Sequence, residues 1–146
     1  QNARKTLGPN SFLFIGVDLI KSKKIIENAY NDSKGISSKF NLNLIIRINK
    51  ELKTDLKQND FEYFSRYNKK TKSIECYLVC KKDQRFFINK KLFFLKKNET
   101  IQTEISKKFT LTSFIKLAKS SGWNVKKYWL DKKNSYAVVL LQNKLV

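Results

Sequence analysis

The spacing of apolar residues changes twice along this chain, and this change limits the possible folds more than any other feature. Residues 11–17 (SFLFIGV) form an almost continuous apolar run, which predicts a strand buried on both faces, as in a parallel sheet covered by helices. Apolar residues in 61–106 alternate or cluster as in antiparallel strands. Residues 110–141 return to a helix followed by strands. The pattern predicts an α/β chain with a β-rich insertion in its middle.

Caps and apolar spacing predict four helices in the sequence. They cover residues 2–7, 23–31, 39–53 and 111–120. Ser22 and Thr110 are the predicted caps of the second and fourth helices, and Ser37 or Ser38 can cap the third. Strands are predicted over residues 61–67, 73–80, 85–89, 92–95, 98–106, 124–130 and 136–141.

The composition excludes several kinds of chemistry. The chain has no histidine, so it cannot form a Ser-His-Asp triad, a Cys-His pair or an imidazole metal site. Two cysteines alone cannot hold zinc, and the four glycines are too scattered for a phosphate-cradling loop. No apolar run approaches the ~20 residues of a membrane span, and the first nine residues are no signal peptide. We therefore expect a cytoplasmic protein with no metal and no membrane partner.

Cys76 and Cys80 lie four residues apart in a predicted strand. At about 3.3 Å per residue they would be roughly 13 Å apart on one face, too far for a disulfide with each other. We interpret them as two reduced, half-buried thiols of an intracellular protein.

The chain carries 31 lysines and arginines against 12 aspartates and glutamates, a net charge of +19. Such a charge would suit nucleic acid or another polyanion. The excess is almost entirely lysine and accompanies many Asn, Ile and Phe, the amino-acid signature of an A+T-rich genome. Phosphate-binding surfaces favour arginine instead. Both explanations stay open; we favour codon bias and do not expect nucleic acid as a partner.

One of the few acidic residues stands beside a serine on a predicted strand. Glu104 and Ser106 fall on its polar face, opposite Ile101, Thr103 and Ile105. Together they can accept hydrogen bonds from a two-nitrogen ring or an ammonium group, although a solvated edge strand explains the same spacing. Tyr30 can be a substrate donor or a core residue with its hydroxyl at the rim. Asp18 follows a strand, where open α/β sheets place ligands. Spacing alone assigns no reaction.

Five short segments carry a resemblance to a known family. They are residues 14–21 (FIGVDLIK), 29–36 (AYNDSKGI), 40–44 (FNLNL), 103–109 (TEISKKF) and 129–131 (WLD). Together they resemble the histidine-specific S-adenosylmethionine-dependent methyltransferases, with consistent spacing from about Leu7 to Leu141. That family includes the ergothioneine-pathway histidine N-alpha-methyltransferases and fungal enzymes that methylate a prenylated tryptophan.

The resemblance implies a class I methyltransferase with a Rossmann-like sheet and an inserted α+β substrate-binding domain. By that pattern, residues 1–20 hold a late strand of the methyltransferase sheet, and residues 21–107 are the substrate-binding domain. Residues 108–146 then return to the sheet with its last helix and two strands.

The resemblance also implies roles for four residues. Tyr30 matches the tyrosine that holds the substrate's amino-acid backbone, and Glu104 and Ser106 match the pair that binds the imidazole ring. Cys76 falls where the histidine enzymes have a methionine beside that ring. The replacement of methionine by Cys76 bears on which amino acid is the substrate, although cysteine and methionine side chains are both soft and apolar. No catalytic residue is assigned.

S-adenosylmethionine is the cofactor that the resemblance implies, with the α-amine of histidine or a related amino acid as the methyl acceptor. In the family, the cofactor loop lies upstream of where this chain begins, and the chain starts at Gln1 and contains no methionine. We therefore expect a fragment that has no cofactor-binding residues, is inactive alone, and needs the missing N-terminal half of the same protein. A basic polyanion-binding module and an inactive truncated remnant are the alternatives.

Overall fold

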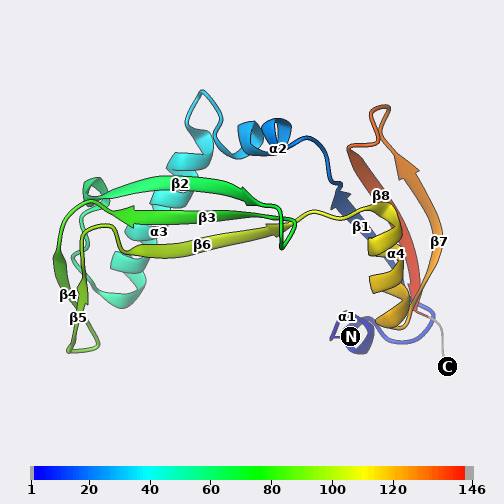
Figure 1. Cartoon of the computed structure of the whole chain (residues 1–146). Helices are drawn as coiled ribbons and strands as arrows, with labels where there is room; N and C mark the ends of the chain where they lie inside the picture. Colours follow the sequence, from blue (N-terminus) through cyan, green and yellow to red (C-terminus); the bar gives the residue numbers. More distant parts are fainter. Residues whose placement is uncertain (1, 144–146) are drawn as a thin grey trace. The chain divides into compact units, whose positions relative to one another are not determined.

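The computed structural model describes residues 2–143 of the 146-residue chain. It divides into two compact units, one made of Gln1–Lys21 with Lys107–Val146 and the other of Ser22–Ser106. Figure 1 labels the helices and strands of each unit. No helix within residues 2–143 is both long and apolar enough to cross a membrane.

The first unit is a three-stranded antiparallel sheet with a helix against one face. Its elements are α1 (Asn2–Leu7), β1 (Phe12–Asp18), α4 (Leu111–Ser120), β7 (Trp123–Leu130) and β8 (Tyr136–Asn143). The strand order is β1-β8-β7, and β8 runs antiparallel to both neighbours. Phe114 and Ala118 on the apolar side of α4 pack with Val17, Val139 and Leu141 of the sheet. This cluster is the core of the first unit.

The prediction that the 11–17 strand is buried on both faces is wrong for the described chain. Burial alternates along β1, and Phe12 and Phe14 are 55% and 64% exposed, whereas Val17 is 3% exposed. Alternate residues of a strand point to opposite faces, and α4 covers only one face. Phe14 stacks on Trp129 on the uncovered face. A run of apolar residues therefore marks a strand here without marking two buried faces.

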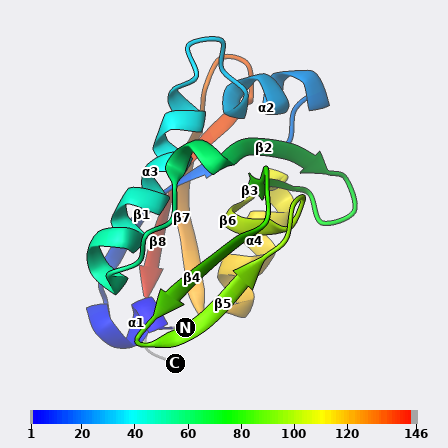
Figure 2. The ribbon, with the colours of Figure 1, turned by 90° about the vertical axis from the view of Figure 1, so that its left-hand side faces the viewer.

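The second unit combines two helices, a three-stranded sheet and a hairpin. Its elements are α2 (Lys23–Tyr30), α3 (Ile36–Leu52), the 3-10 turn η1 (Gln58–Asp60), β2 (Phe61–Asn68), β3 (Ser73–Cys80), β4 (Gln84–Ile88), β5 (Lys91–Leu95) and β6 (Thr100–Lys107). The sheet order is β2-β3-β6, with β2 antiparallel to β3. Strands β4 and β5 form a separate antiparallel hairpin (Figure 2). Every predicted strand is thus confirmed to within two residues.

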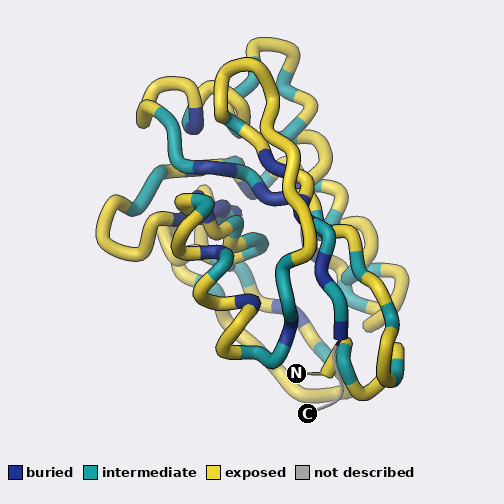
Figure 3. The backbone as a smooth tube through the Cα atoms, turned by 90° about the vertical axis from the view of Figure 1, so that its right-hand side faces the viewer, coloured by how far each residue is buried: buried dark blue, intermediate teal, exposed yellow. Residues whose placement is uncertain are grey.

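Both helices of this unit cover the same face of the sheet. Every second residue of β3 is fully buried on that face, namely Ile74, Cys76, Leu78 and Cys80. Ile26 of α2 packs with the first two of these residues, and Ile45 of α3 packs with the last two. Buried segments are dark blue in Figure 3 and lie along strands and helices, whereas the turns between them are yellow.

The two cysteines face this core as free thiols. Both have 0% exposure, so they are fully buried rather than half-buried as predicted. The reason is that β3 is the central strand of its sheet and lies under both helices.

Two of the three predicted helix caps are confirmed. Ser22 and Thr110 accept hydrogen bonds from backbone N–H groups at the starts of α2 and α4. The third cap is wrong, because α3 begins at Ile36 rather than at residue 39, and Gly35 occupies its N-cap at φ 65°. A carboxylate upstream of both predicted serines, that of Asp32, does the capping.

The simple alternation predicted for residues 98–106 is also wrong. Thr103 Oγ1 donates to Asn41 Oδ1 of α3 at 2.6 Å, and Ser106 Oγ accepts from Tyr30 of α2 at 2.8 Å. Both helices cover one face of the sheet. Thr103 and Ser106 therefore contact the same helical layer, although alternation places them on opposite faces of the strand. Thr103 and Glu104 are neighbours in the strand, and both are half-buried. Ile105, which the alternation places with Thr103, is 62% exposed.

Candidate functional site

The second unit brings predicted site residues from distant parts of the chain together. Tyr30, at the end of α2, donates its hydroxyl hydrogen to Ser106 Oγ of β6 at 2.8 Å, across 76 positions of sequence. Glu104 lies two residues before Ser106 and is half-buried. Cys76 lies on the central strand with no exposed surface.

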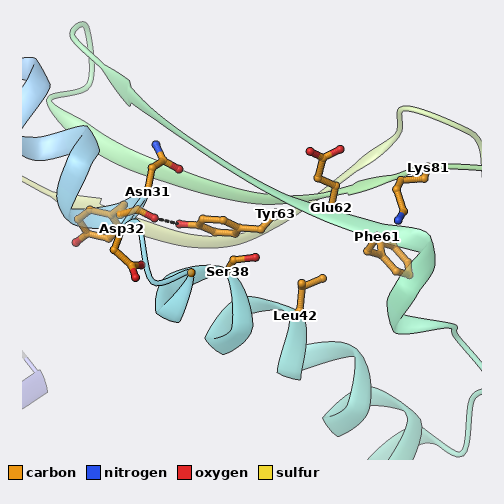
Figure 4. Close-up of a pocket in the computed structure, with 10 residues that line it drawn as sticks. Asn31, Asp32, Ser38, Leu42, Phe61, Glu62, Tyr63 and Lys81 are labelled. Carbon is orange, nitrogen blue, oxygen red and sulfur yellow. Dashed lines mark hydrogen bonds between the residues drawn. The ribbon is translucent and has the colours of Figure 1, made fainter.

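Tyr63 of β2 joins this group, although the sequence analysis did not single it out. Its hydroxyl donates to the backbone carbonyl of Tyr30 at 3.1 Å and lies 3.3 Å from Cys76 Sγ. Figure 4 shows Tyr63 reaching from β2 toward the turn that holds Asn31 and Asp32. The sequence contains a pattern that could have identified Tyr63. Tyr63, Ser65 and Tyr67 place hydroxyl groups on the strand face where alternation predicts burial.

The Tyr63 phenol is held in its neutral form. Burial raises its pKa first, and the neighbouring Cys76 thiol and the negative charge of Glu104 raise it further above its usual value. At neutral pH, Tyr63 therefore keeps its proton and acts as a hydrogen-bond donor.

Two side-chain contacts tie the end of α2 to β2. Ser65 Oγ donates to Asn31 Oδ1 at 2.8 Å, and the backbone N–H of Tyr67 donates to Glu27 Oε1 at 3.1 Å. These bonds lie on both sides of Tyr30 in sequence. They therefore limit how far the last turn of α2 can move relative to the strand.

A cavity of about 620 Å³ borders Tyr30 and Tyr63, a size typical of small-molecule pockets. Its other lining residues are Asn31, Asp32, Gly35, Ser38, Leu42, Phe61, Glu62 and Lys81, most of which are labelled in Figure 4. Glu104 and Ser106 do not line it. The cavity opens beside β2, one edge of the sheet, whereas these two residues are on β6, the other edge. Tyr30 touches both places, so this cavity and the predicted polar pair are neighbouring but separate features.

Glu104 differs from the other acidic side chains of the chain. Among the partly or fully buried acids, a hydrogen-bond or ion-pair partner is present for Asp18, Glu27, Asp32, Asp60 and Glu75. Within residues 2–143, the half-buried Glu104 carboxylate makes no hydrogen bond or ion pair. A half-buried charge without a protein partner is unfavourable. Glu104 is therefore a carboxylate that can accept a hydrogen bond from a donor group of a ligand.

Asp18, unlike Glu104, has ion-pair partners in the protein. Its carboxylate pairs with Lys21 at 2.6 Å and with the buried Lys108 at 2.8 Å. Burial works against ionisation, but hydrogen bonds from Lys108 and Lys21 hold its pKa below the usual value. We assign Asp18 to the structure of the first unit rather than to a ligand.

The glycines of the described residues are scattered along the chain. Gly8, Gly35 and Gly122 have positive φ angles, but each closes a different turn. No group of three or more His, Cys, Asp or Glu side chains in residues 2–143 could hold a metal. No glycine-rich loop follows a strand in this part of the chain.

This chain of two α/β units, with a polar pair facing a tyrosine, matches a known enzyme class. Residues 1–143 match the family described as histidine-specific, S-adenosylmethionine-dependent methyltransferases, and the chain belongs to that family. The resemblance read from the five sequence segments is thereby confirmed.

Two curated relatives carry the name histidine N-alpha-methyltransferase. The chain is 27% identical to the Mycolicibacterium smegmatis protein over 138 residues, which is 92% of this chain and 43% of that protein. It is also 27% identical to the Mycobacterium tuberculosis protein over 134 residues, 90% of this chain and 42% of that protein. The chain thus spans less than half the length of these relatives.

Proposed function

We propose that this chain is the C-terminal portion of an S-adenosylmethionine-dependent N-methyltransferase that acts on the α-amine of histidine or a related amino acid. The observation that carries the proposal is Glu104, a half-buried carboxylate without a protein partner, placed two residues from Ser106 on one strand. The family to which the chain belongs methylates histidine and depends on S-adenosylmethionine. The two named relatives agree with this substrate.

The polar pair suits an imidazole ring. The Glu104 carboxylate can only accept, so it would receive the N–H of one ring nitrogen, while the Ser106 hydroxyl can donate to or accept from the other. Tyr30, hydrogen-bonded to Ser106, would hold the amino-acid backbone next to the ring. A ring without nitrogens would leave the carboxylate without a donor, so apolar amino acids should bind far less well.

Cys76 has a different place in this proposal from the three polar residues. It is fully buried and its sulfur contacts the Tyr63 hydroxyl. We assign it to the soft wall of the site behind Tyr63, where it takes the place of the family's methionine. Its smaller volume leaves more room near the ring, which makes Cys76 the residue to examine when related amino acids are compared.

The two units have separate roles in the proposal. The Ser22–Ser106 unit, close to the 21–107 segment given by the resemblance, would be the inserted substrate-binding domain. Strand β1 would be a late strand of a Rossmann-like sheet, since β8 is its one neighbouring strand within the described chain. Groups outside this chain would hold S-adenosylmethionine and supply the methyl group. Neither a polyanion-binding module nor an inactive remnant is supported by any comparison.

The described residues would contribute to catalysis by positioning. Methyl transfer from a sulfonium needs the acceptor amine unprotonated and in line with the methyl group, and orientation of this kind supplies up to roughly 7–11 kcal/mol. Glu104 and Ser106 would fix the ring and Tyr30 the backbone. Together they would fix the direction in which the α-amine points.

The proposal is tested by assaying the full-length protein with S-adenosylmethionine and a set of amino acids. We expect histidine to gain methyl groups on its α-amine, identified by tandem mass spectrometry. Phenylalanine, the matched apolar ring, should react with kcat/KM at least tenfold lower. Equal rates on the two amino acids, or no reaction with histidine, would contradict the proposal. The 146-residue chain alone should neither react nor bind S-adenosylmethionine.

A further inference from the structure

Tyr63 lies where three of the proposed binding residues meet, yet the binding scheme leaves it without a role. Its hydroxyl contacts the Tyr30 carbonyl and the Cys76 sulfur, and it feels the charge of Glu104. Its ring packs in the cluster that also contains Ile26 and Ile74. A partly buried ring packed in this cluster has little room to move, so the hydroxyl is held in one place.

We propose that Tyr63 is a positioning residue that fixes Tyr30 through a directed chain of hydrogen bonds, from the Cys76 thiol to the Tyr63 hydroxyl to the Tyr30 carbonyl. This inference rests on the proposed function, because Tyr30 matters to binding only if the unit holds an amino acid. It assigns Tyr63 no contact with the substrate.

The direction of the chain follows from counting protons. A carbonyl oxygen can only accept, and a phenol has one proton to give. Tyr63 therefore donates its one hydroxyl proton to the Tyr30 carbonyl at 3.1 Å. The 3.3 Å contact with Cys76 must then be made by the thiol hydrogen, which points at the phenol oxygen. Cys76 is thereby held as a neutral thiol rather than as a thiolate.

The Tyr30 carbonyl needs such a donor because of its place in the helix. Tyr30 is the last residue of α2, and the last carbonyls of a helix have no N–H partner within it. Tyr63 satisfies this carbonyl from the neighbouring strand. The other end of the same residue, its hydroxyl, bonds to Ser106 at 2.8 Å. Tyr30 is thus held by both its backbone carbonyl and its hydroxyl. Loss of the bond from Tyr63 would loosen the backbone end, which sets the position of the side chain.

The test is Tyr63→Phe in the full-length protein, which removes the hydroxyl and keeps the ring. We expect KM for histidine to rise about 3–10-fold, the loss of one ordinary hydrogen bond, with kcat within about twofold of wild type. A purely structural loss would instead lower the active fraction, and so kcat, and leave KM unchanged. Tyr67→Phe is the matched control, since it removes a hydroxyl from the same face of β2 outside this chain of bonds, and it should leave both constants unchanged.

A second readout does not depend on histidine. The S–H stretching band of Cys76, assigned in the infrared spectrum by its disappearance in Cys76→Ala, should lie at the lowered frequency of a hydrogen-bonded thiol. It should move to a different frequency in Tyr63→Phe and stay in place in Tyr67→Phe. Should Tyr63→Phe fail to fold, the band of the wild-type protein decides, because a free-thiol frequency there overturns the chain of bonds.

The two proposals fail in different ways. Wild-type protein that does not use histidine would remove the proposed function, while the thiol band would still report whether Cys76 donates to Tyr63. Wild-type protein that methylates histidine, together with a Tyr63→Phe variant of unchanged KM, would overturn the positioning role and leave the proposed function intact.

Discussion

Asp32 explains why α3 begins where it does. Its two carboxylate oxygens accept hydrogen bonds from the backbone N–H groups of Ile36 and Ser37, each at 2.8 Å. These are N–H groups that a helix leaves without partners at its start. The bonds from Ser37 and then Ile36 lower the pKa of Asp32 from 3.8 to about 2. The carboxylate therefore stabilises the helix in its charged form.

We predict that Asp32→Ala lowers the Tm by about 2–6 °C at pH 7, as the loss of a helix cap does. The folded pKa of Asp32 lies below its usual value, so its contribution is present above pH 3.8 and is lost as the pH falls toward 2. Thermal melts from pH 6 to pH 2 should show the wild-type and variant Tm values converging over that window. Asp55→Ala, an equal change of charge in the loop after α3, should show no such convergence.

Single residues also show what the sequence could and could not reveal. The resemblance placed Tyr30 and Ser106 together, and the structure joins them directly by a hydrogen bond. It gave no role to Tyr63 or Asp32. Tyr63 looks like a core residue in an alternating strand, and its role depends on a carbonyl that is distant in sequence. Asp32 caps from a turn, so its function depends on a backbone path that residue identity does not specify.

At the scale of elements, two segments of the first unit are joined by an ion cluster. Leu19 and Phe109 form a parallel bridge, so the end of β1 lies beside the segment that precedes α4. The Asp18 carboxylate reaches across to Lys108, which is only 1% exposed, and also binds Lys21. A buried lysine depends on a carboxylate partner because desolvation disfavours its charge.

We predict that Asp18→Asn destabilises the full-length protein by about 1–3 kcal/mol. Removing one partner of a fully buried ion pair costs more than this, but Asp18 is partly open to solvent, which screens the pair. Lys108→Met, which replaces the buried cation with an apolar side chain of similar length, should cost less than Asp18→Asn. Urea unfolding of the three proteins measures both differences, and the reverse order of stabilities would contradict the role given to this pair.

The elements also mark the limit of pattern-based prediction. Strand positions followed from alternation, but burial of β1 and the register of β6 did not. Burial depends on what covers a face, and only α4 packs on the β1 sheet in the described chain. Thr103 and Ser106 of β6 make side-chain hydrogen bonds to α3 and α2, which no local period reports.

At the scale of the whole molecule, the chain contains two units with separate cores and one family assignment. The lysine-rich composition does not shape these cores, because Lys108 is the one buried lysine among residues 2–143. The absence of histidine, which excluded many catalytic devices, is consistent with a family whose substrate is histidine.

Histidine binding to the full-length protein, measured by titration calorimetry, tests the central proposal most directly. Glu104→Ala should weaken histidine binding by roughly 1.5–3 kcal/mol, the value of a hydrogen bond to a charged group, or about 10–150-fold in Kd. Glu62→Ala is the matched control, because this exposed glutamate lines the separate cavity beside β2. We expect it to leave the affinity unchanged. Unchanged affinity in Glu104→Ala, or a loss in Glu62→Ala alone, would contradict the site assigned to histidine.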